Sequence, residues 1–213
     1  MLVLPLEEGK IKNTSSSKIK TGEEIKEGDS RISEDAFFDF LKSRVGKLDA
    51  IVITGGEPTL QADLPAFIEK IRSLGFKVKL DTNGTNPEMI KKLLSAKLID
   101  YLAMDLKSSL DKYEQATGVK ANLDNIKRSI KIIIESGLPY EFRTTVVPDL
   151  SDLDDIKEMA QLIKGADKWY IQRFKSDTDL INSSFQGLPA HSEEVMEKMV
   201  KVARQFVKVS ELR

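Results

Sequence analysis

The 213-residue sequence contains no cysteine and a single histidine, His191. The lack of thiols excludes disulfides, thiolate nucleophiles, thiolate zinc sites and an iron–sulfur cluster held by this chain's own side chains. One histidine likewise excludes a histidine-rich metal centre. His191 directly precedes Ser192, an expected helix N-cap, and is interpreted as a surface residue. Chemistry by side chains of this chain therefore falls to carboxylates, lysine, arginine, tyrosine and hydroxyl groups.

The sequence also lacks an excess of positive or negative charge, and it lacks long apolar runs. Lys+Arg 33 and Asp+Glu 34 leave a net charge of −1, which excludes the broad basic surface of a general nucleic-acid binder. No apolar run approaches the roughly 18 to 20 residues that span a bilayer. The N-terminal apolar stretch 1–6 is shorter than the core of a signal peptide. We expect a cytoplasmic protein with no membrane and no nucleic-acid partner.

The first 31 residues differ in composition from the rest. The segment from Glu7 to Arg31 carries a Ser-Ser-Ser run and small clusters of Lys and Glu, and its only large apolar residues are Ile11, Ile19 and Ile25. So few apolar groups do not offset the entropic cost of ordering a chain. The sequence therefore predicts an irregular, flexible segment at 1–31, followed by a folded portion at 32–213.

From residue 32 onward, short apolar runs alternate with stretches of helical periodicity. Strand-like runs that are separated by helices indicate βαβ units and a parallel sheet. Periodicity alone leaves open whether that sheet is doubly wound or forms a closed or partly closed barrel. Ser33 and Asp63 are expected to cap the first two helices. The expected strands are 50–53, 76–80, 101–106, 142–147, 169–174 and a short one at 206–209; the expected helices are 33–44, 63–74, 87–94, 123–134, 153–163 and 192–202.

Polar residues occupy the positions where the expected strands end. In parallel α/β folds, functional groups lie at the carboxyl ends of the strands, in the loops that lead into helices. Glycines allow a sharp turn close to a ligand, and a carboxylate suits an amine. The polar positions are Thr54-Gly55-Gly56-Glu57-Pro58-Thr59, Asp81-Thr82-Asn83-Gly84, Asp105-Leu106-Lys107, Arg143, and Gln172-Arg173.

Each of these positions also has an ordinary structural interpretation. Gly-Gly-Glu-Pro suits a tight connection between a strand and a helix, and Asp-Thr-Asn-Gly suits a turn before a helix. Asp105 and Lys107 suit a structural ion pair, and Arg143 suits a side chain that extends into solvent. Taken together, acids, amides and bases at one rim of a parallel sheet suit a small zwitterionic ligand with an amine, a carboxylate and a ribose.

Four motifs resemble those of a known family. They are Ile53-Thr54-Gly55-Gly56-Glu57-Pro58-Thr59-Leu60, Leu80-Asp81-Thr82-Asn83-Gly84, Met104-Asp105-Leu106-Lys107 and Phe142-Arg143-Thr144-Thr145-Val146-Val147-Pro148. In this order they resemble radical S-adenosylmethionine enzymes, in particular the activating enzymes of anaerobic ribonucleotide reductase and pyruvate formate-lyase. The resemblance extends from Ile32 to about Phe174, roughly two-thirds of the chain.

The resemblance implies an α/β fold of the radical SAM type, a partial (β/α) barrel with parallel strands. It implies S-adenosylmethionine as cofactor, reduced at a [4Fe-4S] cluster to methionine and a 5′-deoxyadenosyl radical. The partner would be a glycyl radical enzyme, such as anaerobic ribonucleotide reductase or pyruvate formate-lyase, which loses a glycine hydrogen. The resemblance implies that Gly55, Gly56 and Glu57 bind the methionyl amine, and that Asp81, Asp105 and Lys107 lie near the carboxylate, ribose or an associated cation. Arg143 would face the cofactor from a later strand, and Pro58 and Asn83 of the same motifs are further implied cofactor-binding residues.

The chain departs from this family in one respect. The family holds its cluster with a Cys-x3-Cys-x2-Cys loop after the first strand, and this sequence has no cysteine. The stretch Met1–Leu6 resembles the segment that comes directly after that loop, so the first strand is expected to be missing. No residue of this chain is accordingly assigned as a metal ligand.

The sequence is compatible with three hypotheses. The chain is the C-terminal portion of a radical activating enzyme, inactive alone, whose cysteines lie on a separate fragment or upstream of this start. Alternatively, it is a cluster-less relative that binds S-adenosylmethionine, a nucleoside or a partner protein without radical chemistry. The third is an unrelated α/β enzyme that uses Asp81, Asp105 and Lys107 for acid–base catalysis.

Overall fold

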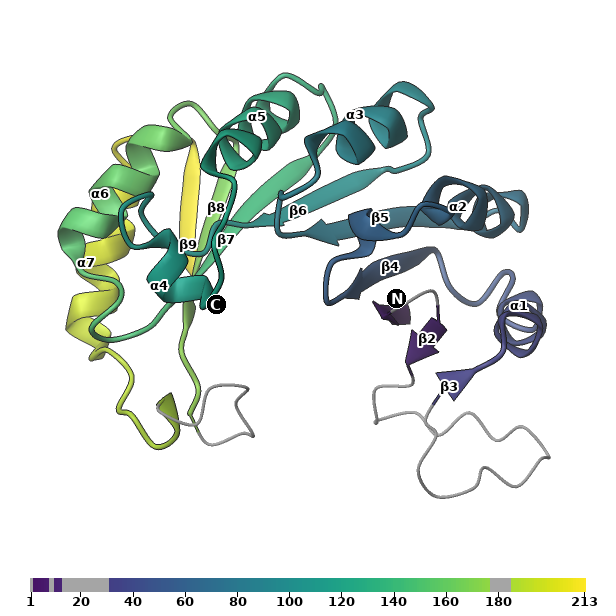
Figure 1. Ribbon diagram of the computed structural model, residues 1–213, viewed down its shortest axis with the longest axis horizontal. Coiled ribbons are helices and arrows are strands. Elements are labelled where there is room, and N and C mark those ends of the chain that lie inside the picture. The colour runs from purple at the N-terminus through teal and green to yellow at the C-terminus, as the bar shows by residue number, and fades with distance from the viewer. Residues whose placement is uncertain (1, 8–9, 13–30, 177–184) are drawn as a thin grey trace. The chain divides into compact units, whose positions relative to one another are not determined.

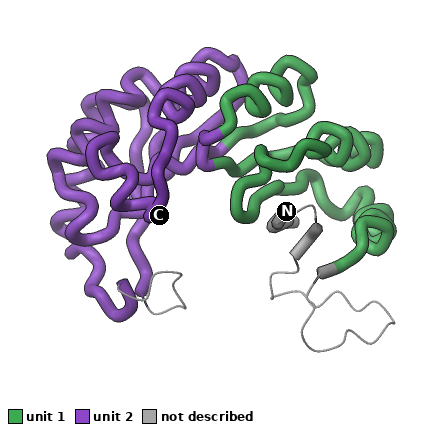
Figure 2. The backbone as a smooth tube through the Cα atoms, viewed as in Figure 1, with its two compact units in different colours: residues 1–82, 86–102 green, residues 83–85, 103–213 purple. Residues whose placement is uncertain are grey.

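The computed structural model describes residues 2–7, 10–12, 31–176 and 185–213, with side chains from residue 32 onward. The chain divides into two compact units (Figure 2). Unit 1 comprises Met1–Thr82 and Asn86–Leu102, and unit 2 comprises Asn83–Thr85 and Ala103–Arg213. No helix among the described residues is long and apolar enough to cross a membrane.

Unit 1 is a sheet flanked by short helices, and its strand order is β3-β2-β1-β4-β5 (Figure 1). Strand β4 runs parallel to β1 on one side and to β5 on the other, whereas β2 is antiparallel to both β1 and β3. Its elements are β1 (Leu2–Glu7), β2 (Lys10–Lys12), β3 (Arg31–Ile32), α1 (Glu34–Lys42), β4 (Ala50–Gly55), the 3₁₀ helix η1 (Pro58–Leu60), α2 (Leu64–Ser73), β5 (Lys77–Thr82) and α3 (Pro87–Ser95).

The sequence predicts irregular structure at 1–31, but the described part of this N-terminal segment forms strands. Residues 2–7 form a strand whose Leu2 to Leu6 pair in parallel with Ile51 to Gly55 of β4. The run Leu-Val-Leu-Pro-Leu has the apolar, β-prone composition that suits a strand beside β4. A strand therefore precedes β4 in the sheet, where none was expected. Residues 8–9 and 13–30, on which most of that expectation falls, lie outside the described residues.

Local sequence explains how the first two helices of unit 1 begin. Ser33 caps α1 by accepting a hydrogen bond from the backbone N–H of Ala36 at 3.2 Å, as expected. Asp63 occupies the N-cap of α2, but its side chain makes no capping hydrogen bond, which differs from its expected role. Pro65, the second residue of α2, fixes a helical φ in the first turn and so favours the start of this helix without a side-chain cap.

Unit 2 contains further parallel strands of the same nine-stranded sheet, covered by helices. Strand β6 (Tyr101–Asp105) begins in unit 1, and its last three residues belong to unit 2. Strand β8 runs parallel to β7 on one side and to β9 on the other, with Phe142 opposite Trp169 and Lys168 opposite Val209. The remaining elements are α4 (Tyr113–Thr117), α5 (Leu123–Ile134), β7 (Tyr140–Val146), α6 (Leu153–Leu162), β8 (Lys168–Arg173), α7 (Glu193–Ala203) and β9 (Val209–Leu212).

The core of unit 2 lies between these strands and their helices. The Trp169 side chain is fully buried, and its indole N–H donates to the Thr144 hydroxyl of the neighbouring strand at 2.9 Å. Helices α6 and α7 pack against each other, and α7 contacts β8 and β9 (Figure 1). Because parallel strands end at one edge of a sheet, this arrangement brings the carboxyl ends of β7 and β8 together.

The α/β class with parallel strands is confirmed in both units. The expected helix at 123–134 coincides with α5, and the other expected helices and the five longer strands lie within two residues of the observed ones at each end. The last strand begins at Val209, three residues later than expected, because the segment 204–207 first turns at the end of α7.

Candidate functional site

The turn after β4 carries the Gly-Gly-Glu-Pro motif. Gly55 has a φ of +138°, which favours glycine because other residues rarely adopt it. A side chain added at Gly56 would meet nothing within 4 Å, so there is open space over this residue. Pro58 then opens the 3₁₀ helix η1, for which Glu57 is the N-cap. The motif therefore forms a tight turn whose second glycine borders open space.

The Glu57 carboxylate joins the ends of β4 and β5. Its side chain is largely buried, with 8% of the residue exposed. Oε1 accepts hydrogen bonds from the Thr59 backbone N–H at 3.1 Å, the Thr59 hydroxyl at 2.5 Å and the Thr82 hydroxyl at 2.7 Å. A buried carboxylate is costly unless such donors surround it. Glu57 is therefore a structural centre of the turn as well as a predicted ligand-binding residue.

Asp81, on β5, has a cationic neighbour on its own strand. Lys79 Nζ lies 3.5 Å from Asp81 Oδ1, and the same ammonium group lies 5.4 Å from the centre of the Tyr101 ring. Residues two apart on a strand point to the same side, which places Lys79 beside Asp81. Lys79 was not predicted as a site residue, although its position two residues before Asp81 on an expected strand indicates such a contact.

Asn83 and Gly84 belong to unit 2, where they form a turn with Thr85. Asn83 Oδ1 accepts from the Thr85 backbone N–H at 3.0 Å and from its hydroxyl at 2.7 Å. Gly84 has a φ of +78°, and its carbonyl accepts from the Ser129 hydroxyl of α5 at 2.7 Å. A Cβ built at Gly84 would lie 2.2 Å from Cε of Met104. Glycine is required here both by conformation and by space.

Asp105 lies between two cations in unit 2. Its Oδ2 accepts from Lys107 Nζ at 3.0 Å, and its Oδ1 accepts from Arg143 Nε at 2.9 Å. A backbone hydrogen bond joins the same two segments, because the Leu106 N–H donates to the Arg143 carbonyl at 2.9 Å. The expected pairing of Asp105 with Lys107 is present, and Arg143, interpreted alternatively as a solvent-exposed side chain, is its second partner.

Asp105→Asn is expected to lower the free energy of unfolding by about 1–3 kcal/mol, because it removes the charge opposite the largely buried Arg143 side chain. That side chain is only 16% exposed. Urea unfolding followed by fluorescence of Trp169, the single tryptophan, measures the effect. Lys107→Met is the control: its side chain is 46% exposed, so a loss below about 1 kcal/mol is expected. Equal losses in the two variants would contradict this account.

The predicted site residues thus form two groups. Gly55, Gly56, Glu57, Pro58 and Asp81 lie in unit 1, and Glu57 is joined there to Thr82. Asn83, Asp105, Lys107 and Arg143 lie in unit 2, where the last three contact one another through Asp105. Among the residues that the structure describes, no three His, Asp or Glu side chains gather in a way that could hold a metal ion.

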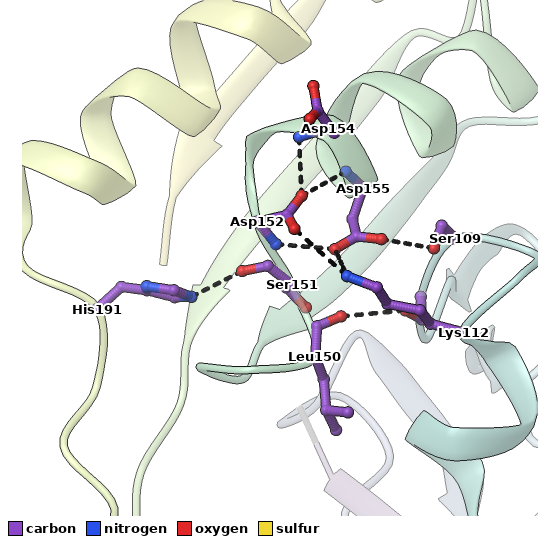
Figure 3. Close-up of polar contacts among 9 residues, drawn as sticks. Ser109, Lys112, Leu150, Ser151, Asp152, Asp154, Asp155 and His191 are labelled. Carbon is purple, nitrogen blue, oxygen red and sulfur yellow. Dashed lines mark hydrogen bonds and ion pairs between the residues drawn. The ribbon is translucent and has the colours of Figure 1, made fainter.

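A polar cluster that the sequence did not indicate lies in unit 2 (Figure 3). Its members, here called the Asp155 cluster, are Ser109, Lys112, Asp152 and Asp155. Lys112 Nζ donates to Asp155 at 2.6 Å and to Asp152 at 3.3 Å. Asp152 caps α6 by accepting from the backbone N–H groups of Asp154 and Asp155, both at 2.9 Å. The capping-box pattern was the only sequence signal for this cluster.

Hydrogen bonding in the cluster shifts two pKa values in opposite directions. The Asp155 backbone N–H, with help from Lys112, lowers the pKa of Asp152 below its ordinary 3.8, against the opposing effect of burial. The hydrogen bond to Asp155 raises the pKa of Lys112 above its ordinary 10.5. A lowered carboxyl pKa stabilises the fold above the unfolded value, and that contribution is lost as the pH falls through the folded pKa.

Asp152→Asn, which keeps an oxygen for the cap, is therefore expected to be less stable than the natural chain at neutral pH. The difference should shrink as the pH falls below about 4, because the Asp152 carboxylate takes up a proton first in the unfolded chain and, at still lower pH, in the folded one. Urea unfolding at a series of pH values between about 7 and about 2 measures it. A stability difference that stays constant over this range would show that the charge of Asp152 contributes nothing.

His191 is half-buried rather than a simple surface residue. Its Nε2 lies 2.8 Å from the Ser151 carbonyl, which can only accept, so this nitrogen carries the proton. Its own carbonyl accepts from Arg173 at 2.8 Å, and Arg173 also pairs with Glu193. His191 therefore ties the segment before α7 to the loop before α6 and to the end of β8.

A fold of parallel strands and helices, with polar groups at the carboxyl ends of the strands, defines a class of α/β proteins that bind ligands at that edge. Residues 27–163 match the radical SAM superfamily. A protein of Methanocaldococcus jannaschii named as a putative glycyl-radical enzyme activating enzyme is 40% identical over 164 residues, which are 75% of this chain and 68% of that protein. The chain belongs to the radical SAM superfamily.

One further relative agrees with this assignment, and two solved structures share the fold. A second protein of Methanocaldococcus jannaschii with the same kind of name is 34% identical over 127 residues, 58% of this chain and 49% of that protein. A domain of pyruvate-formate lyase-activating enzyme from Bacteroides vulgatus has the same fold, with a TM-score of 0.62 at 18% identity, and the match covers 78% of this chain and 99% of that domain. Streptococcus suis SuiB bound to S-adenosylmethionine matches with a TM-score of 0.61 at 14% identity, over 83% of this chain and 42% of that one.

The radical SAM family uses S-adenosylmethionine and a [4Fe-4S] cluster. The residues of this chain suit the first of these groups but not the second. Open space over Gly56 and a carboxylate in the same turn suit an ammonium group, and the Lys107–Asp105–Arg143 group offers both signs of charge to a carboxylate and a ribose. The cluster does not fit, because the 213 residues contain no thiolate ligand.

Proposed function

We propose that this chain is the S-adenosylmethionine-binding portion of a glycyl-radical enzyme activating enzyme. The observation that carries the proposal is that each unit, taken by itself, presents a hydrogen-bonded polar group on its strands: the Glu57 turn after β4 in unit 1, and in unit 2 the Lys107–Asp105–Arg143 group at the end of β6 and on β7. The 40% identity to a relative with that name supports the choice among radical SAM activities.

In this proposal the turn after β4 receives the methionyl amine. Gly56 leaves room for the ligand, and Glu57 provides a negative potential while it holds the turn through Thr59 and Thr82. Pro58 fixes the start of η1 and keeps the backbone of the motif rigid. Asp81 adds a second carboxylate at the end of the neighbouring strand.

The second group, considered by itself, suits the more polar parts of such a ligand. Lys107, partly exposed, offers an ammonium group to a carboxylate, and Asp105 offers oxygens to ribose hydroxyls. Arg143 holds Asp105 in place, and Asn83 adds an amide at the preceding turn. In the activating enzymes of the family, bound S-adenosylmethionine would supply the 5′-deoxyadenosyl group that takes a hydrogen from the partner's glycine.

We further propose that the chain alone is inactive, and that the cluster's thiolates come from outside these 213 residues. The lack of cysteine supports this directly. The intact mass of the native protein from its source cells is the first check. A species clearly heavier than 23.9 kDa shows further residues on the same polypeptide, where the cysteines are then sought, and one at 23.9 kDa directs the search to a separate polypeptide.

The activity is tested by anaerobic reconstitution. The chain is combined with a polypeptide that carries a Cys-x3-Cys-x2-Cys segment, with iron, sulfide, a reductant, S-adenosylmethionine and a glycyl radical enzyme. Electron paramagnetic resonance should then detect a glycyl radical that is lost when the cysteines are replaced by serine.

The partner is an anaerobic ribonucleotide reductase or pyruvate formate-lyase, and the compartment is the cytoplasm, where those enzymes are expected.

The lack of cysteine also favours a second candidate, a cluster-less relative that binds S-adenosylmethionine, a nucleoside or a partner protein without radical chemistry. It predicts ligand binding at the same groups and no radical under any reconstitution. A radical formed only when the chain, the cysteine-bearing segment and the partner are all present would exclude it. Membership of the superfamily sets aside the third hypothesis, an unrelated acid–base enzyme.

A further inference from the structure

Asp155, in the first turn of α6, is a buried acidic side chain of unit 2. Only 4% of the residue is exposed. Its Oδ1 accepts from the Ser109 hydroxyl at 2.7 Å, and its Oδ2 accepts from Lys112 Nζ at 2.6 Å and from the Asp152 backbone N–H at 2.9 Å (Figure 3). Two of these three donors come from one short segment, the residues directly after β6.

That segment, residues 106–112, contains Lys107 of the candidate site and is fastened on both sides of it. Before Lys107, the Leu106 N–H donates to the Arg143 carbonyl, and the Leu106 carbonyl accepts from the Thr144 hydroxyl. After it, Ser108 and Ser109 are buried, and the Ser108 hydroxyl donates to the Leu150 carbonyl at 3.4 Å. The position of Lys107 is therefore set by contacts with β7 and with the start of α6.

Polar contacts of this kind fix geometry more than they add stability. A buried ion pair is weak evidence for stability, because well-packed apolar residues often replace it at no loss. Hydrogen bonds are directional, however, and a fully satisfied buried network holds its members in one arrangement. Functional groups need such support, since small displacements weaken binding.

We propose that Asp155 is a positioning residue of the candidate site, which holds residues 106–112 through Ser109 and Lys112 and so keeps Lys107 beside Asp105. The inference rests on the proposed function in assigning Lys107 to S-adenosylmethionine. Asp155 itself lies against Ser109 and Lys112 and acts on the ligand only through this segment.

The first measurement does not involve the cofactor. The full chain and its Asp155→Asn variant are acetylated briefly under native conditions, and the labelling rate of each lysine is read by mass spectrometry. Lys107 should be labelled several-fold faster in the variant, while Lys198, which pairs with Glu194 on α7, serves as the internal reference. Ile163→Val, at the other end of α6, is the matched control for general destabilisation, and it should leave the Lys107 rate unchanged.

The second measurement is a double-mutant cycle on S-adenosylmethionine affinity. Asp155→Asn should weaken binding about tenfold in the natural chain, and should have no further effect in a Lys107→Met background. A purely structural role would give the same loss in both backgrounds. An unchanged Lys107 labelling rate, or additive losses, would overturn the proposal. Failure of the natural chain to bind S-adenosylmethionine would overturn the proposed function instead, and the labelling result would still decide whether Asp155 positions Lys107.

Discussion

Glu57→Ala is expected to lower the free energy of unfolding by about 2–4 kcal/mol, because it leaves buried donors of Thr59 and Thr82 without their acceptor. The three donors converge on one oxygen, Oε1, so a single substitution removes all three contacts. Urea unfolding followed by far-ultraviolet circular dichroism measures the loss. A variant as stable as the natural chain would show that the carboxylate does not hold the turn.

Glu57→Gln tests the negative charge of this residue separately from its hydrogen bonds to Thr59 and Thr82. Glutamine keeps an oxygen that accepts from Thr59 and Thr82, so most of the stability should remain. The negative charge is lost, and S-adenosylmethionine binding should weaken by about 1–3 kcal/mol because an ammonium group loses a charged partner. Calorimetry on the folded variant measures this. Unchanged affinity would count against the assignment of the Gly-Gly-Glu-Pro turn to the amine.

Gly84→Ala is expected to lower the stability of unit 2 by about 1–3 kcal/mol, because the new methyl group overlaps Met104 and the backbone lies in the left-handed region. The added Cβ would lie 2.2 Å from Met104 Cε, and Met104 is fully buried, so its displacement is restricted. Urea unfolding followed by Trp169 fluorescence reports on this unit.

Two further variants separate the conformational cost of Gly84→Ala from the cost of its overlap with Met104. Gly118 has a similar φ of +70° but open space around its Cβ position, so Gly118→Ala should cost only about 1 kcal/mol for the conformation. In the double variant Gly84→Ala/Met104→Ala the overlap is relieved, so the combined loss should be smaller than the sum of the two single losses. Additive losses, or equal losses at Gly84 and Gly118, would contradict the packing argument.

Much of the fold could be predicted because its signals are local. The stripe Leu123, Ile126, Ile130, Ile133 defines α5, and the short apolar run Ala50–Ile53 defines the body of β4. The N-terminal strand was not predicted, although its apolar run is a local signal of the same kind. Its pairing with residues 51–55 of β4 could not be predicted, because it joins segments that are distant in sequence.

Candidate site residues could be predicted from the sequence, but their contacts could not. Parallel strands that alternate with helices imply that residues at the strand ends share one edge, which singled out Glu57 and Asp105, whereas Arg143 was singled out within an expected strand and lies in the middle of β7. The sequence does not reveal that Glu57 accepts from Thr82, or that Arg143 and Lys107 share Asp105, because these contacts depend on register and rotamer. The Asp155 cluster was missed for the same reason: Lys112 and Asp155 are 43 residues apart.

We propose that these strand-end residues bind S-adenosylmethionine, and isothermal titration of the purified 213-residue chain with that compound is the decisive measurement. We expect saturable binding, weakened about tenfold in Lys107→Met, whose fold should be nearly intact. A natural chain that is folded by circular dichroism and shows no saturable binding, or one whose binding is unaffected by Lys107→Met, would contradict it.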